Sequence, residues 1–512
     1  MLERIVSRLT DRGCLLDPGA AAHIQRQSHP ERYLEDTLAQ MNEVPFVLTL
    51  EMLREIETHM PTAGATLVQP NPVLGETFHA PSLPTLSPPL TGRRVHAVDY
   101  AAEVRVLRDA SMSPTGSGDV RDFVRYFNDR LESVAKLLRQ RREVANAVRI
   151  KDAGRAGKEV QLIGLVKEKS RSPSGHRFFT LEDTTGEAEI LVGQDKPELT
   201  GSFDSLLNDE VIGVVARPTK DGKLLVADQL IRPDIPYTSD RPRPEGNLHV
   251  GFLGDVHVGS KTFLGKPFRA MLRWLHGNEG SERERDVAQS LKYLVFPGDL
   301  VDGVGVYPGQ QEGLEIEDVY KQYETFAKEL ENLPEHIHLV FVPGNHDATR
   351  PNEPQPALSK DIRSLFDRHE KTFVSNPSQF SLHGVNILAY HGYSMIDFAT
   401  TVPGFRMDQP IPIMKQMLQS RHIAPTYGGK TPISPEERDF LVIDQVPDLF
   451  VTGHVHVAAM ERYKHVTLVN GGTWQAQTDY QRMQNLVPTP CRLPVVNLTT
   501  LSGTMIDFAG AE

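Results

Sequence analysis

The sequence Leu248-His249-Val250-Gly251-Phe252-Leu253 is a short apolar run that leads directly into Gly254-Asp255-Val256-His257-Val258-Gly259. Such a run, bounded by a glycine, predicts a buried strand. Residues two apart on an extended chain point the same way, so Asp255 and His257 can both reach one point beyond the strand. Because α/β sheets build their sites where strands end, this stretch predicts an α/β fold with a site at one edge of the sheet.

Four further pieces repeat this pattern, since each follows an apolar, β-branched run and presents Asp, Asn or His. They are Gly298-Asp299, Gly344-Asn345-His346-Asp347, His391-Gly392 and Gly453-His454-Val455-His456. A single Gly-Asp or Gly-His pair is more often a turn than a ligand pair. Five pieces of one chemical kind, each after a predicted strand, indicate one shared site.

The side chains of these pieces are carboxylates, an amide and imidazoles, without a thiolate. This mixture favours Mn²⁺, Fe or Zn²⁺ over Ca²⁺ or a structural zinc. We expect two divalent metal ions, Mn²⁺ in the first place, with Fe, Zn²⁺ or Mg²⁺ as alternatives. Two neighbouring ions can hold a phosphate and lower the pKa of a water molecule. His346 is the candidate general acid, and Asp347 is expected to orient its imidazole.

The ordered set of motifs resembles the calcineurin-like metallophosphoesterase family. The resemblance implies a two-layer β-sandwich flanked by helices, with a binuclear metal site. By the family's pattern, one ion is held by Asp255, His257, Asp299 and His456. The other is held by Asp299, Asn345, His391 and His454, with His346 as the general acid.

A closer resemblance lies in the residues between the motifs, at 299–310, 344–351 and 421–428. These stretches are similar to the small subunits of archaeal D-family DNA polymerases. That family implies a 3′→5′ proofreading exonuclease that forms a heterodimer with a large polymerase subunit. It also implies a single-stranded or frayed 3′ DNA end as substrate. A sliding clamp or a primase is a further candidate partner.

Two other functions fit the same residues. The chain can be a non-catalytic scaffold for the polymerase, in which case loss of the metal ligands leaves DNA synthesis intact. It can also be a phosphatase or a phosphodiesterase of other specificity. The additional domains argue against this last function, because a small-molecule phosphatase has no evident need of them.

The chain divides into five parts by composition and periodicity. They are a helical domain (1–58), a Pro-rich linker (59–92), a strand and helix joined to the next domain (93–145), an OB-fold barrel (146–240) and the metallophosphoesterase domain (247–500). The barrel is predicted from five short strands with a helix between the third and the fourth.

Four residues are candidates to contact DNA. Lys167 and Arg177 lie on the predicted barrel, Arg350 follows the Gly344 motif, and Tyr393 follows His391. Basic and aromatic side chains together are typical of single-strand binding. The alternative is that the barrel aromatics fill its interior and the charged residues are an ordinary solvated surface.

Composition narrows the class of protein. The 512 residues predict two to four domains. A formal net charge of −12 is unlike that of a free-standing nucleic-acid binder. The two cysteines, Cys14 and Cys491, exclude a disulfide framework and favour a reducing cytoplasm. No apolar run approaches the ~18 residues of a membrane span, so we expect no membrane partner.

Overall fold

The computed structural model describes residues 97–511 apart from 112–115, 117 and 156–158, together with 15–16, 23–24 and 47–48. The chain forms two compact units, Met1–Pro81 and Ser82–Glu512. In the first unit, β1 (Leu15–Leu16) pairs in parallel with β2 (Val47–Leu48). The predicted helical domain and Pro-rich linker otherwise lie outside the described residues.

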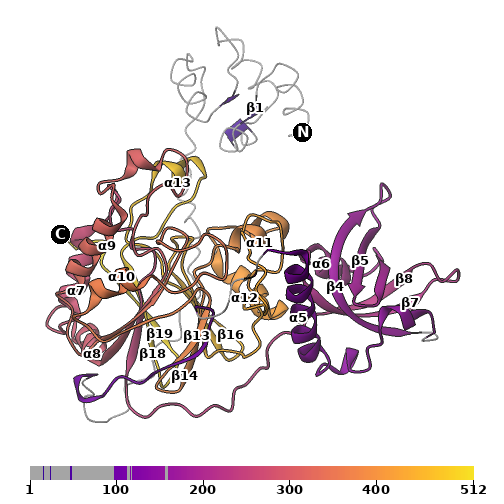
Figure 1. Ribbon diagram of the computed structural model, residues 1–512, viewed down its shortest axis with the longest axis horizontal. Helices are drawn as coiled ribbons and strands as arrows, with labels where there is room; N and C mark the ends of the chain where they lie inside the picture. The colour runs from indigo at the N-terminus through magenta and orange to yellow at the C-terminus, as the bar shows by residue number, and fades with distance from the viewer. Residues whose placement is uncertain are drawn as a thin grey trace, which may run out of the picture. The chain divides into compact units, whose positions relative to one another are not determined.

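Two six-stranded sheets form the centre of the second unit (Figure 1). The first sheet has the order β12 (Lys371–Phe373), β11 (His338–Val342), β10 (Leu291–Pro297), β9 (His249–Phe252), β18 (Arg492–Asn497) and β19 (Gly503–Asp507). The second has the order β16 (Ala459–Tyr463), β17 (Val466–Asn470), β15 (Leu449–Thr452), β14 (Val385–Ala389), β13 (Ser378–Leu382) and β3 (Val104–Asp109).

The strands that carry the motifs are parallel within each sheet. β10 pairs in parallel with β9 and β11, and β14 pairs in parallel with β15. Every residue of β9, β10 and β11 is buried, which explains why their sequences are continuous apolar runs without alternation. Because the strands run in one direction, the polar residues that follow them come out at the same edge.

Apolar side chains fill the space between the sheets, with Phe252 and Val295 from one sheet packed against Ile387 and Val451 from the other. Three helices cover the outer face of the first sheet: α7 (Gly265–Trp274), α8 (Glu282–Ser290) and α9 (Val319–Leu330). The second sheet is covered by α11 (Met395–Thr401) and α12 (Pro410–Ser420). The predicted α/β class is therefore confirmed, and the two sheets form a sandwich between helices.

Residues 160–231 form a closed barrel with the strand order β4-β5-β6-β8-β7. The elements are β4 (Val160–Arg171), β5 (Arg177–Asp183), β6 (Gly186–Val192), α6 (Pro197–Asp204), β7 (Val211–Pro218) and β8 (Leu225–Ile231). Phe179 is buried inside the barrel, as the alternative interpretation of this aromatic residue expected. The name OB-fold for this barrel stays an interpretation.

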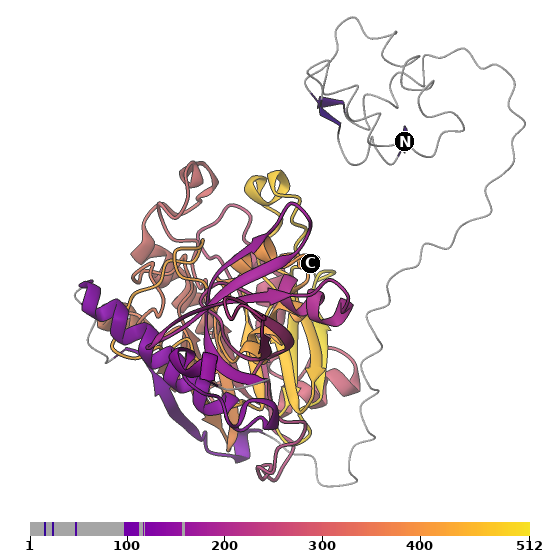
Figure 2. The same cartoon turned by 90° about the vertical axis from the view of Figure 1, so that its right-hand side faces the viewer.

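The segment before the barrel is divided between two bodies. β3 pairs antiparallel with β13 of the sandwich. In contrast α5 (Val120–Leu138), the long purple helix of Figure 2, packs through Val134 and Leu138 against Val215 of the barrel. The prediction joined this whole segment to the barrel and is corrected for β3. The cause is that a short alternating pattern identifies a strand but not its partner, which here lies far along the chain, beyond the whole barrel.

A buried guanidinium joins α5 to both neighbours, and Figure 1 shows this helix between the barrel and the sandwich. Arg130 Nε donates to Asp439 Oδ2 of the sandwich at 2.7 Å, and Arg130 Nη1 donates to the carbonyl of Asp209, just before β7, at 3.1 Å. Asp439 is also paired with His422 at 2.8 Å. Further on, Arg241 and Arg243, which follow the barrel, both form ion pairs with buried Asp448.

The remaining helical turns are short. They are η1 (Ala97–Asp99), η2 (Arg142–Val144), η3 (Ile150–Arg155), η4 (Gln310–Gly313), α10 (Lys360–Arg363), η5 (Ser364–Phe366) and α13 (Asp479–Met483). Among the described residues, no helix is both long and apolar enough to cross a bilayer.

We expect Arg130→Leu to lower the free energy of unfolding by about 3–5 kcal/mol, because it leaves a buried carboxylate without its guanidinium. Denaturant titration of the full chain measures the change. The matched control is Arg217→Leu, whose partner Asp228 lies at the barrel surface, and it should leave the unfolding midpoint where it is. Equal shifts for the two variants would contradict the importance of the buried pair.

Candidate metal centre

The structure brings all seven predicted ligands to one edge of the sandwich. Each follows the end of a central strand: Asp255 and His257 after β9, Asp299 after β10, Asn345 after β11, His391 after β14, and His454 and His456 after β15. Two groups consist of predicted ligands alone, Asp255 with His257 and His456, and Asp299 with His391 and His454, and a third group joins His257 to Asp302 and His346. Within each group the atoms lie within 4.8 Å of one another.

The backbone at these residues is held in a conformation that side chains rarely adopt. The φ angles of Asp255, His257, Asp299, His454 and His456 lie between 49° and 70°, in the left-handed region. Such residues persist where the surroundings enforce them, and they gather at functional sites. Gly298 is required for close approach, because a Cβ there would overlap the imidazole of His391.

The surroundings of His391 show that this point fits a cation. Its Nδ1 donates to the carbonyl of Pro297 at 2.9 Å, so Nε2 is the nitrogen that faces the other polar groups. Nε2 lies 3.0 Å from Asn345 Oδ1 and 3.3 Å from Asp299 Oδ2, both of them acceptors. Burial alone would lower the pKa of His391, but the carboxylates of Asp299 and Asp255 outweigh it and raise the pKa to about 10. Only a positive charge satisfies this arrangement.

The second group has the same character. Nε2 of His257 lies 3.1 Å from Nε2 of His456, so two imidazoles converge on one point. Oδ2 of Asp299 lies 3.7 Å from Nε2 of His257 and 3.3 Å from Nε2 of His391. One carboxylate therefore faces both groups, as a ligand shared between two ions must.

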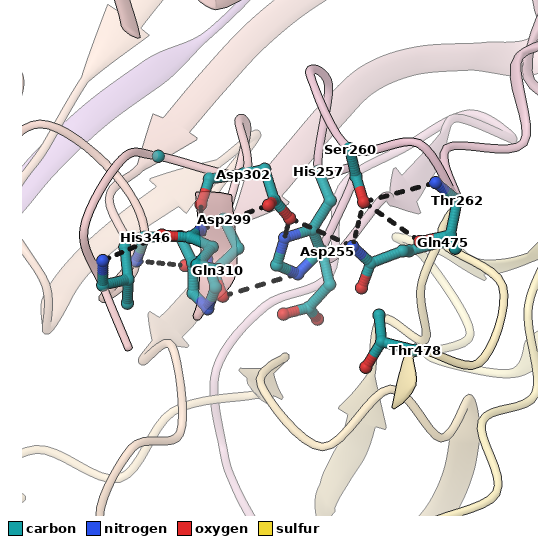
Figure 3. Close-up of polar contacts among 12 residues, drawn as sticks. Asp255, His257, Ser260, Thr262, Asp299, Asp302, Gln310, His346, Gln475 and Thr478 are labelled. Carbon is teal, nitrogen blue, oxygen red and sulfur yellow. Dashed lines mark hydrogen bonds and ion pairs between the residues drawn. The ribbon is translucent and has the colours of Figure 1, made fainter. Parts of the chain in front are cut away.

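Polar residues that sequence reasoning missed hold the imidazoles in place. Asp302 Oδ1 lies 3.0 Å from Nδ1 of His257, and it also accepts from Gln475 Nε2 at 3.0 Å (Figure 3). Gln481 Nε2 lies 2.8 Å from Nδ1 of His456. Gln475 could have been found, because it follows Gly471-Gly472 after β17 and so repeats the pattern of the ligand motifs. Partners of this kind fix the orientation of a ligand ring.

His346 lies beside the ligands, with its ring 4.7 Å from that of His257 between centroids. Its Nδ1 donates to the carbonyl of Asp302 at 2.6 Å, so Nε2 is left for chemistry. Burial lowers the pKa of this imidazole.

Asp347 does not orient His346, and that prediction is corrected. Its carboxylate accepts hydrogen bonds from the backbone N–H of Gly344 at 2.8 Å and from the hydroxyl of Tyr323 at 2.8 Å. Burial raises the pKa of Asp347 to about 6, and Asp299 adds to the effect. The side chain of Asp347 is buried and bonded to the backbone of Gly344, so Asp347 fixes the loop that carries Asn345 and His346.

Three of the four predicted DNA contacts are already paired within the chain. Arg350 pairs with Glu436, Lys167 with Glu187 and Arg177 with Asp204. These cations have carboxylate partners in the free chain, and their contact with DNA stays a prediction. Tyr393 remains a candidate, since its ring centroid lies 5.2 Å from that of the ligand His454.

Several known proteins are similar to this chain in sequence. The family model for the B-type subunit of DNA polymerases alpha and epsilon matches residues 250–459, the range that holds every predicted ligand. The DNA polymerase II small subunit of Methanothermobacter thermautotrophicus is 40% identical over 396 residues, 77% of this chain and 81% of that one. The small subunit of Halobacterium salinarum is 36% identical over 512 residues, 99% of each chain. This chain belongs to the family of DNA polymerase II small subunits.

The predicted resemblance to the small subunits of D-family DNA polymerases is thereby confirmed. An archaeal phosphodiesterase of known structure covers 51% of the small subunit at 10% identity, with a TM-score of 0.25, which is too low to carry an argument.

We expect the wild-type small subunit to bind two Mn²⁺ ions, and Asp299→Ala to lose both, because that carboxylate faces both groups of ligands. Equilibrium dialysis followed by elemental analysis measures the stoichiometry. His346→Ala is the matched control and keeps both ions, since this imidazole is bonded to a backbone carbonyl. An Asp299→Ala chain that still holds two ions would contradict the shared role.

We expect Asp302→Ala to weaken Mn²⁺ binding by about 10–100-fold, because His257 loses the carboxylate that orients its ring. Calorimetric titration of the small subunit with Mn²⁺ measures the affinity. Asp221→Ala, in the turn between β7 and β8, removes a carboxylate far from the ligands in sequence and fold and serves as the control. Equal affinities for the two variants would count against the orienting role.

Proposed function

We propose that this polymerase small subunit is a metal-dependent 3′→5′ exonuclease that removes unpaired nucleotides from the end of a DNA strand. The observation that carries the proposal is the convergence of all seven ligand side chains, with the carboxylate of Asp299 facing both groups. A subunit that served only as a scaffold would have no use for buried, strained ligands in this geometry.

The residues that would hold the ions follow from the two groups. Asp255, His257 and His456 would hold one ion, and Asn345, His391 and His454 the other, with Asp299 between them. Two divalent ions, of which we favour Mn²⁺, would supply Lewis-acid stabilisation of the phosphodiester and lower the pKa of a water molecule. The ligand types leave Fe, Zn²⁺ and Mg²⁺ as alternatives.

His346 acts on the leaving group. Hydrolysis adds a hydroxyl to phosphorus and breaks the bond to O3′ of the penultimate nucleotide, which must then take up a proton. Nδ1 of His346 is committed to the carbonyl of Asp302, so the protonated imidazole donates this proton from Nε2 and takes up another from solvent water. The products are a nucleoside 5′-monophosphate and a strand with a new 3′ hydroxyl.

The partners that we propose follow from the family. The relatives are named small subunits, and we infer a large subunit that synthesises DNA and forms a heterodimer with this chain. A strand whose 3′ end frays from its template would pass from the large subunit to the metal centre. A sliding clamp or a primase remains a further candidate partner.

We expect the small subunit with Mn²⁺ to shorten 5′-labelled single-stranded DNA from its 3′ end, one nucleotide at a time. His346→Ala should lower the rate about 10²–10⁴-fold, because a general acid contributes that much, and Asp299→Ala should abolish cleavage. Denaturing gels resolve the products, and the assay is run with the chain alone and with the large subunit.

The control is Asp221→Ala, which should cleave like the wild type. If wild-type chain and complex are both inert while DNA synthesis proceeds, the scaffold function is the correct one. Cleavage of small phosphodiesters without cleavage of DNA would instead show a phosphodiesterase of other specificity.

A further inference from the structure

Two tyrosines stack on each other beside the metal centre. The rings of Tyr307 and Tyr480 lie 5.4 Å apart between centroids at an interplanar angle of 28°. Tyr307 also meets the ring of His346 edge-on at 6.2 Å. Tyr480 is the outer member of the pair and is 49% exposed. Tyr480 is therefore half exposed, and Tyr307 lies between it and the candidate general acid.

Each tyrosine lies next in sequence to a residue whose hydrogen bonds connect it with the metal ligands. Tyr480 lies on α13, which Figure 1 shows at the upper edge of the sandwich, and the next residue, Gln481, bonds to the ligand His456. Gln481 also closes the capping box of α13 with Thr478, so the helix is fixed at its first turn. Tyr307 is fixed through Gln310, which bonds to the backbone of Val306, the residue before Tyr307, and to the backbone of Asp302. Asp302 in turn bonds to the ligand His257. The pair is thus fixed relative to the ligands.

Two exposed apolar side chains follow Tyr480 in sequence, and the exposed ion pair of Asp479 with Arg482 flanks it on α13. Met483 is 74% exposed and Val487 is 69% exposed, and both follow Tyr480 in the same short stretch. Exposed apolar groups gathered beside a site for a charged group mark a place that binds something with an apolar face. A nucleobase has such a face, and its phosphodiester carries the charge that the ligand cluster fits.

Stacking also supplies affinity for DNA in a chain whose net charge is negative. The net charge is −12, and the predicted basic contacts Arg350, Lys167 and Arg177 are paired with carboxylates of the same chain. Stacking is a source of affinity for a strand end that does not depend on these cations. Base–aromatic stacking contributes about 1–3 kcal/mol per base and tolerates any sequence.

We propose that Tyr480, supported from behind by Tyr307, stacks on the unpaired terminal nucleobase of a DNA strand whose last phosphodiester lies at the metal centre. A base inside a duplex has both faces covered by its neighbours, whereas a frayed terminal base has a face to offer. The tyrosine pair therefore selects unpaired ends. This inference rests on the proposed exonuclease function and names the feature of the substrate that the site recognises.

The test that does not depend on hydrolysis uses an oligonucleotide with 2-aminopurine at its 3′ end, titrated in EDTA with the full-length chain. Stacking on tyrosine quenches this fluorophore, so we expect quenching with the wild type and with Tyr480→Trp. Tyr480→Ala should bind about 5–150-fold more weakly. The control is Tyr237→Ala, which removes a tyrosine that is 78% exposed beside Lys464. Absence of quenching with the wild type, or equal quenching with Tyr480→Ala, overturns the proposal.

A second measurement separates stacking from a purely structural role. With Mn²⁺, Tyr480→Ala should lower kcat/KM about 5–150-fold for a strand with a normal terminal base and leave it unchanged for a strand whose terminal nucleotide is abasic. An equal loss on both strands would show that the pair only holds α13 in place, and would overturn the proposal. If Tyr480→Ala weakens only the association with the large subunit, and neither the binding nor the cleavage of DNA, the stacking proposal is overturned as well.

The two proposals fail in different ways. If the wild type quenches 2-aminopurine but hydrolyses neither strand, the exonuclease function is wrong, while recognition of the strand end by Tyr480 is supported. If the wild type hydrolyses both strands and Tyr480→Ala does so equally well, the exonuclease stands and the stacking inference is wrong.

Discussion

The carboxylate of Asp299 is the group that joins the two halves of the metal centre. Burial would raise its pKa, but the surrounding imidazoles, His391 first, keep the pKa well below its usual range. The residue is therefore an anion inside the protein, and its Oδ1 accepts the backbone N–H of His346 at 2.9 Å. Strands β9, β10, β14 and β15 must end close to this one carboxylate for the site to exist. The order and direction of the central strands meet that requirement.

The ligands could be predicted from the sequence because their signal is local. A buried strand, a glycine and a polar side chain lie within a few residues of one another, and the parallel sheets then bring separate copies of this pattern together. Asp302 belongs to the motif that begins at Gly298, but its role and that of Gln481 were not predicted, since they depend on hydrogen bonds to His257 and His456, 45 and 25 residues away. The pairing of Arg350 with Glu436 spans 86 residues and is equally invisible in the sequence.

Charge and aromaticity have separate tasks in the proposed function. In the cluster of carboxylates and imidazoles, negative charge draws cations inward, and those cations in turn attract a phosphodiester. The exposed face of Tyr480 carries no charge and can meet a base regardless of the ions. Recognition of the strand and chemistry on its backbone would thus rest on different physical forces, which salt affects unequally.

The left-handed backbone at Asp255, His257, Asp299, His454 and His456 has a consequence for the evolution of the fold. Each such residue costs of the order of 1–3 kcal/mol relative to a relaxed backbone. Glycine would remove this cost, but it has no side chain that could act as a metal ligand. Selection for thermal stability alone would therefore replace these residues. A chain of this family that lost its metal chemistry would be free to become more stable, so under the proposed function the strain that remains here reflects selection for activity over stability.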